Sequence, residues 1–69
     1  MTAATKFTDW LAAQKHRDDP VGDLARDAIS DASFPWNASD TRTVSRYLAR
    51  RASSAAFDAL EDAVAEWSR

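Results

Sequence analysis

The chain has 69 residues, the size of one small domain near the lower limit for folding without a covalent or metal staple. It contains no cysteine, which excludes disulfides and thiolate metal sites and favours a reducing cytosol. Nine basic and eleven acidic residues give a net charge of −2, which argues against a dedicated nucleic-acid-binding protein.

The start of the chain lacks the long apolar run of a signal peptide. No segment approaches the roughly 20 apolar residues that span a bilayer. We therefore expect a soluble, cytoplasmic protein without a membrane partner. Residues 1–69 are expected to form a single domain in which residues 1–4 fray.

The first half of the chain predicts two helices. The first runs from about Thr5 to His16, with apolar residues at helical spacing at Phe7, Trp10 and Leu11. The second begins where Asp19 can cap it and Pro20 suits its first position. Its apolar stripe is Val21, Leu24, Ala25, Ala28, Ile29 and Ala32.

The second half predicts two more helices after a loop around Pro35. Ser39 or Asp40 can cap a third helix that runs to about Arg51, with Val44, Tyr47 and Leu48 on its apolar face. Ser53 or Ser54 can cap a fourth that ends near Trp67, with Phe57, Leu60, Val64 and Trp67 on one side. The prediction is an all-α, compact bundle of four to five short helices.

Two large aromatic residues, Phe34 and Trp36, lie in the loop and on none of these helical faces. Phe34 is interpreted as a plug that turns into the bundle, while Pro35 fixes the exit from the second helix. Trp36 has two interpretations. It is a lid packed over the core, which we favour, or a partly exposed anchor for a partner, since tryptophan is enriched in binding hot spots.

The sequence resembles the YozE-like family of small bacterial proteins, whose fold is SAM-like (sterile alpha motif-like). The resemblance is carried by "SFP", a following "SD", and "SRYL" in the third helix, with support from "FTDWL" and from "FD" at Phe57 and Asp58. It implies a bundle of four or five short helices and assigns no activity. Trp36 departs from the family pattern, where a polar or charged residue is expected. The SAM-like fold suggests protein or nucleic-acid interaction by analogy alone.

The side chains that catalysis requires are scarce. The single histidine, His16, lies at the end of the first predicted helix, where capping or solvation accounts for it. A single glycine excludes a phosphate-binding glycine loop. Asp18, Asp19 and Asp23 lack the spacing of a calcium loop. We predict no enzyme activity, no cofactor and no metal site.

Charged residues are arranged in stripes. Arg42, Arg46 and Arg50 recur at every fourth position of the third helix, and Asp23, Asp27 and Asp31 do the same on the second. Both stripes are predicted to point largely away from the core, so that direct pairing between them involves flanking members such as Asp31. The outer side of the fourth helix is acidic, through Asp58, Glu61, Asp62 and Glu66.

The basic stripe has three interpretations. It is a solvated face, the commonest role of such a stripe, or it binds another molecule. Among the binding roles we rank first a protein-interaction module in which Arg42, Arg46 and Arg50, with Trp36, meet an acidic partner surface. Self-association is a variant, because unlike patches on one molecule can pair head to tail. The alternative is weak, salt-dependent binding of nucleic-acid phosphates through the same three arginines.

Overall fold

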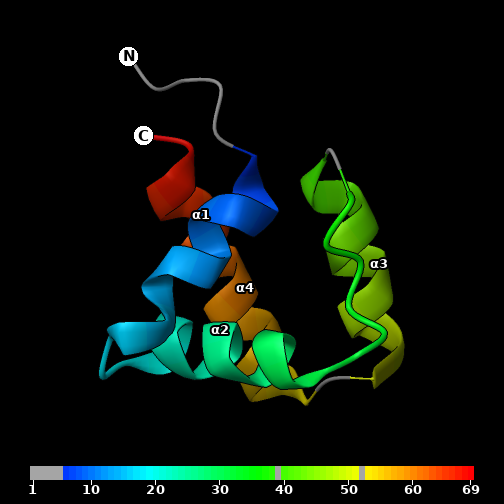
Figure 1. Ribbon diagram of the computed structural model, residues 1–69, viewed down its shortest axis with the longest axis horizontal. Coiled ribbons are helices and arrows are strands. Elements are labelled where there is room, and N and C mark those ends of the chain that lie inside the picture. Colours follow the sequence, from blue (N-terminus) through cyan, green and yellow to red (C-terminus); the bar gives the residue numbers. More distant parts are fainter. Residues whose placement is uncertain (1–5, 39, 52) are drawn as a thin grey trace.

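The structure, a computed structural model, describes residues 6–38, 40–51 and 53–69. These residues form four α-helices and one short 3₁₀ helix, and they contain no strand (Figure 1). The elements are α1 (Phe7–Ala13), η1 (Gln14–His16), α2 (Pro20–Ser30), α3 (Thr41–Arg51) and α4 (Ser54–Trp67). The predicted all-α bundle of four to five short helices is confirmed.

The first predicted helix differs from the structure at both ends. The α-helix begins at Phe7, because Lys6 before it is extended, and the last three predicted residues form η1 instead. Thr5 and the residues 1–4 that were expected to fray lie outside the described residues. A 3₁₀ turn commonly ends a helix because it satisfies terminal carbonyls within a tighter turn. Here the backbone N–H of Arg17 donates to the carbonyl of Gln14 at 3.0 Å, and the chain then leaves the helix.

The start of α2 depends on a close approach of two backbone segments. Asp19 caps the helix as predicted, since its carboxylate accepts from the N–H of Gly22 at 2.9 Å, with Pro20 in the first position. A Cβ atom added to Gly22 would lie 2.0 Å from the carbonyl oxygen of Arg17. A glycine is therefore required here by packing, which its position in the sequence did not indicate.

The caps of the two later helices are also those predicted. The Asp40 carboxylate accepts from the N–H of Thr43 at 3.0 Å at the start of α3. The Ser53 hydroxyl accepts from the N–H of Ala56 at 3.3 Å at the start of α4. Ser39, the alternative cap for the third helix, lies outside the described residues.

Helix α2 ends at Ser30, two residues before the end of the predicted stripe. Asp31 is extended, and its carboxylate accepts from the N–H of Ser33 at 2.9 Å. Such a local side-chain bond competes with continuation of the helix. Ala32 was predicted to lie on the apolar stripe, but it is exposed in the loop.

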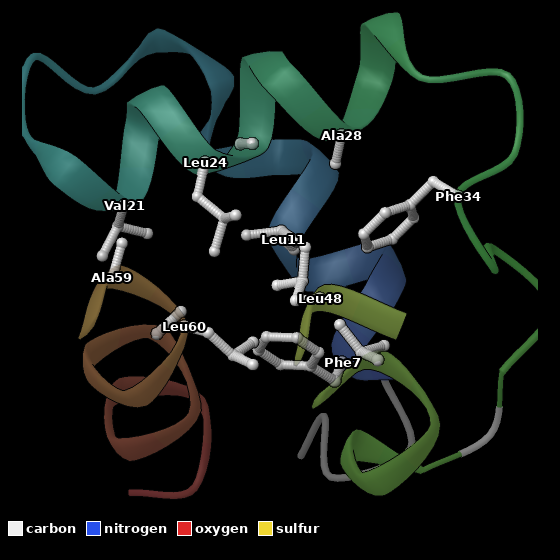
Figure 2. Packing of buried hydrophobic residues seen from close by; sticks show 12 residues of the cluster. Phe7, Leu11, Val21, Leu24, Ala28, Phe34, Leu48, Ala59 and Leu60 are labelled. Atoms are coloured by element: carbon white, nitrogen blue, oxygen red, sulfur yellow. The ribbon is translucent and has the colours of Figure 1, made fainter. Parts of the chain in front are cut away.

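The core is assembled from all four α-helices and from the loop between α2 and α3 (Figure 2). Phe34 is 5% exposed and points into the bundle, so the prediction of a loop plug is confirmed. The buried apolar residues are Phe7, Leu11, Val21, Leu24, Ala25, Ala28, Phe34, Val44, Leu48, Ala59, Leu60 and Ala63.

Two residues that were assigned to core-facing stripes are exposed. Ile29 is 47% exposed and Phe57 is 37% exposed. Periodicity marks an apolar stripe, but the neighbouring helices determine how much of its width they cover. Ile29 and Phe57 lie on margins of their stripes that this packing leaves open.

Helix α3 stands to one side of the bundle, and the loop after α2 runs along it (Figure 1). Its inward face buries Val44 and Leu48, which are 0% and 8% exposed. The loop contributes an edge-to-face contact between the rings of Phe34 and Tyr47, whose centroids are 5.8 Å apart. The opposite face of α3 is turned away from the core.

Candidate interaction surface

The three arginines predicted as a binding stripe lie on the outward face of α3. Arg42, Arg46 and Arg50, hereafter the arginine face, are one helical turn apart and exposed. Within the described part of the chain, none of the three guanidinium groups forms a hydrogen bond or an ion pair. Arg42 and Arg46 lie near enough to the Asp40 carboxylate to help lower its pKa, after the larger effect of the bonds from Thr43.

Three other arginines have their guanidinium groups in contact with groups of the same molecule. Arg17 donates to the Asp19 carboxylate at 2.8 and 3.0 Å and to both Glu66 oxygens at 2.8 and 2.9 Å, which links the turn before α2 to the end of α4. Arg26 donates to the backbone carbonyls of Lys15 and Arg17 and pairs with Asp23. The guanidinium carbon of Arg51 lies 4.6 Å from the centroid of the Tyr47 ring. The arginine face differs from these three in having no bonded partner.

The acidic stripe of α2 does not pair with the arginine face. Asp23 pairs with Arg26 within α2, and Asp27 is exposed. Asp31 is the member that reaches α3, where it accepts a hydrogen bond from the Tyr47 hydroxyl. The contact therefore involves a flanking member of the stripe, as expected, but its partner is a tyrosine.

The Asp31–Tyr47 hydrogen bond affects the protonation of both groups. The Tyr47 hydroxyl is the main cause of the lowered pKa of Asp31, and the N–H of Ser33 and the charge of Arg51 act in the same direction. The hydrogen bond to the carboxylate also raises the pKa of Tyr47, since it favours the protonated phenol. At neutral pH the pair is a carboxylate that accepts from a neutral hydroxyl.

Trp36 is half-buried and packs against the core. Its ring contacts Phe34, with centroids 4.6 Å apart. Its backbone carbonyl accepts a hydrogen bond at 3.0 Å from the hydroxyl of Thr8, which is 1% exposed on α1. This environment fits the interpretation of Trp36 as a lid, and part of the side chain remains accessible.

Two shallow grooves border α3. One, of about 250 Å³, is nearly apolar and lies where the loop meets the arginine face; its lining is Pro35, Thr43, Arg46, Tyr47 and Arg50. The other, of about 490 Å³, lies between α3 and α4; its lining is Thr41, Arg42, Ser45, Phe57, Leu60, Glu61 and Val64. The arginine face thus has a hollow on each side, a nearly apolar one beside the loop and a mixed polar and apolar one beside α4.

A third hollow, of about 290 Å³, lies where α2, α3 and α4 approach one another. Asp31, Tyr47 and Arg51 are among its polar lining, and their side chains already contact one another. Among the described residues, no group of three or more histidine, aspartate or glutamate side chains could hold a metal ion. No helix in that part of the chain is long and apolar enough to cross a membrane.

The spacing of the three arginines predicts that they share one helical face, but the contacts that position α3 are not evident from the sequence. Nothing in the spacing of Thr8 and Trp36 indicated that a buried hydroxyl would bind the loop backbone 28 residues away. The Asp31–Tyr47 contact was predicted in part: Asp31 was expected to reach the third helix, but Tyr47 was not identified as its partner.

The chain is similar to a known protein family and to curated bacterial proteins. The family described as the YozE SAM-like fold matches residues 6–68. A UPF0346 protein of Streptococcus agalactiae serotype Ia is 43% identical over 49 residues, which cover 68% of this chain and 69% of the relative. A UPF0346 protein of Streptococcus equi subsp. zooepidemicus is 41% identical over 51 residues, which cover 71% of this chain and 72% of the relative.

The names of these relatives state no activity, substrate or partner. No solved structure shows significant similarity to the chain. The family match extends over all four helices and includes the loop that carries Phe34. The chain therefore belongs to the YozE family of SAM-like helical proteins, as the resemblance in its sequence predicted.

Proposed function

We propose that this chain is a non-catalytic protein-interaction module that binds an acidic partner surface with the arginine face of α3. The observation that carries the proposal is the contrast between its arginines. Arg17, Arg26 and Arg51 are engaged within the fold, whereas Arg42, Arg46 and Arg50 project outward without a hydrogen bond or ion pair in the described residues. Their charges remain available to a partner.

The groove beside the arginine face supports a protein as the partner. Pro35 and the Tyr47 ring give it an apolar lining, and Arg46 and Arg50 border it. A peptide with an apolar side chain flanked by carboxylates would match this combination, because Arg binds carboxylates through a planar fork of donors. Trp36 lies next to Pro35 in the chain, but its half-buried ring packs against Phe34 and is not part of the groove lining.

A non-catalytic role is consistent with the side chains present. The chain has one histidine and no cysteine, and His16 is exposed on η1. A hydroxyl nucleophile needs an adjacent base, and His16 is the one imidazole of the sequence. The lack of cysteine also supports the cytoplasm as the place where the module acts.

Phosphate binding by the same arginines is the second candidate. Three outward guanidinium groups spaced by one turn can each meet a phosphate. The acidic residues of α2 and α4 and the net charge of −2 oppose it. Three phosphate contacts would give weak binding that falls steeply with salt.

The two functions are separated by titrating ¹⁵N-labelled protein at low salt. One probe is a helical peptide of glutamate and leucine, and the other is a single-stranded oligonucleotide. We expect the peptide to shift the Nε–Hε signals of Arg46 and Arg50, and Arg46→Glu to abolish that shift. Arg69→Glu, with the same charge change at the exposed end of the chain, should leave it intact.

Tighter binding of the oligonucleotide than of the peptide, lost in Arg46→Glu, would favour phosphate as the ligand. Absence of binding to both probes at low salt would contradict both functions and leave the arginine face as a solvated surface. An equal loss of peptide binding in Arg46→Glu and Arg69→Glu would show that net charge alone drives the association.

A further inference from the structure

The groove between α3 and α4 combines an apolar row with charged side chains. Its apolar part comes from α4, where Phe57, Leu60 and Val64 lie in one line along the helix. Leu60 is buried at its base and Val64 is half-buried, but Phe57 is 37% exposed. An exposed aromatic residue next to other apolar side chains is characteristic of a contact site.

The two walls of this groove carry opposite charges. Arg42 lines the α3 wall and Glu61 lines the α4 wall, and both side chains are exposed. In the part of the chain that the structure describes, neither side chain forms an ion pair or a hydrogen bond. Neither charge is therefore bonded within the described residues, although Arg42 lies near the Asp40 carboxylate, and the two opposite charges border the same groove.

A surface with these properties is complementary to itself. If a two-fold axis runs along the groove, α3 of one copy lies over α4 of the other. Arg42 of each copy then faces Glu61 of the second copy, so that one rotation forms both pairs. The same rotation brings the two Phe57 side chains together in the middle of the contact.

We propose that the α3/α4 groove is the interface of a symmetric homodimer in which Phe57 packs against its counterpart and Arg42 pairs with Glu61 of the second copy. A standard interface of about 800 Å² per partner would cover roughly one sixth of the 4598 Å² surface of this chain. The groove mixes a small apolar centre with a charged border, which is the composition of a reversible contact. The dimer is therefore concentration-dependent.

The dimer leaves Arg46 and Arg50 accessible, because these residues line the groove on the other side of α3, beside Pro35. An acidic partner surface and a second copy can therefore bind different sides of the same helix. The two proposals share Arg42, which the dimer would take from the arginine face, but the dimer is tested by self-association and the proposed function by peptide binding at Arg46 and Arg50, so their failures are distinguishable.

The test is sedimentation equilibrium of the whole chain from about 10 μM to about 1 mM. We expect a reversible equilibrium between monomer and dimer. Phe57→Ser should remove the dimer over this range, because it takes away the central apolar contact. Thermal unfolding of the variant is the folding control, and Phe57 is exposed enough for the fold to persist.

Charge reversal tests the symmetry and does not depend on Phe57. Arg42→Glu alone and Glu61→Arg alone each place like charges across the interface, so each should dissociate at least about tenfold more readily than wild type. An equimolar mixture of the two variants restores both opposite-charge pairs. We expect that mixture to dimerise as wild type does, although neither variant does so alone.

Arg50→Glu is the matched control, since it reverses the charge of an arginine that lines the other groove, beside Pro35, and it should leave the dimer unchanged. A wild-type chain that stays monomeric at about 1 mM would overturn the proposal. Failure of the mixed charge-reversal variants to associate would also overturn it, as would equal weakening by Arg50→Glu and Arg42→Glu.

Discussion

Two sets of side-chain contacts, here called joints, link separate segments of the chain around the core, and they differ in chemistry. The charged joint is formed by Arg17, Asp19 and Glu66, and it ties the turn before α2 to the end of α4. The aromatic joint is formed by Phe34, Trp36 and Tyr47, and it ties α3 and its loop to the core. The first joins side chains that are about one third exposed, whereas the second rests on a plug that is 5% exposed.

The difference shows how stability is distributed. Salt and acid act on the charged joint, because solvent reaches its ions and protonation removes its carboxylates. The aromatic joint depends mainly on burial and shape, which pH and salt hardly affect. The ring contacts that hold α3, which carries the arginine face, are thus less sensitive to solution conditions, and the Asp31–Tyr47 hydrogen bond is the part of its attachment that acid can remove.

The largest expected effect is that of Phe34→Ala. Removal of a buried phenylalanine typically costs about 3–5 kcal/mol, which approaches the whole stability of many small domains. Phe57→Ala is the matched control, since the same side chain is removed from an exposed site and should cost about 1 kcal/mol or less. Urea unfolding followed by circular dichroism at low protein concentration measures both. Equal losses in the two variants would mean that the aromatic joint does not depend on its plug.

A smaller effect is expected for Trp36→Ala. The side chain is half-buried against Phe34, so its truncation should cost about 1–2 kcal/mol. As a lid, Trp36 should affect stability while leaving the binding of the glutamate–leucine peptide unchanged. Unchanged stability together with lost peptide binding would instead identify Trp36 as a partner anchor. Urea unfolding and the NMR titration together distinguish the two roles.

The smallest effect concerns the charged joint and depends on pH. The pKa of Glu66 lies below its ordinary 4.5, chiefly because Arg17 donates to it. The pKa of Asp19 lies below its ordinary 3.8, because the Gly22 N–H and then Arg17 donate to it. Because the folded protein lowers both pKa values, the two carboxylates stabilise the fold fully at pH values above their ordinary pKa values. This stabilising contribution is lost as the pH falls through the lowered pKa values of the folded protein.

Arg17→Met should therefore lower the free energy of unfolding at neutral pH, and its difference from wild type should shrink in acid. Tyr47→Phe removes the main cause of the lowered pKa of Asp31, so its difference from wild type should also shrink in acid. Urea unfolding over a series of pH values measures both. Arg50→Met is the control, and its difference should not vary with pH. A constant difference for Arg17→Met would show that the charged joint contributes through packing alone.

Local chemistry made much of the fold predictable. Asp19, Asp40 and Ser53 cap the helices that their positions predicted, since capping depends on residues within one turn. Phe34 was predicted to turn into the bundle because "SFP" was interpreted as the structural part of the loop, with Pro35 fixing the exit from the second helix. The requirement for Gly22 was not predictable, since it arises from contact with the Arg17 backbone, and a chain read alone does not show how closely a turn approaches a helix.

The arginines of the candidate site could be predicted from the sequence, whereas the grooves that border them could not. The spacing of Arg42, Arg46 and Arg50 places them on one helical face regardless of tertiary structure. The two grooves beside that face depend on how α3 lies against Pro35 and against α4, which are tertiary contacts. The exposure of Phe57 has the same origin, because its neighbours decide whether a residue at the margin of an apolar stripe is covered.

The hydrogen bond from Thr8 to the loop has a consequence for what position 36 can tolerate. The acceptor is the backbone carbonyl of residue 36, so the tether between α1 and the loop does not depend on which side chain that residue carries. Natural variation or protein engineering can therefore alter position 36 without losing the anchor. A fluorescent or photo-crosslinking amino acid placed there would report on the neighbourhood of α3 while the loop stays attached to the bundle.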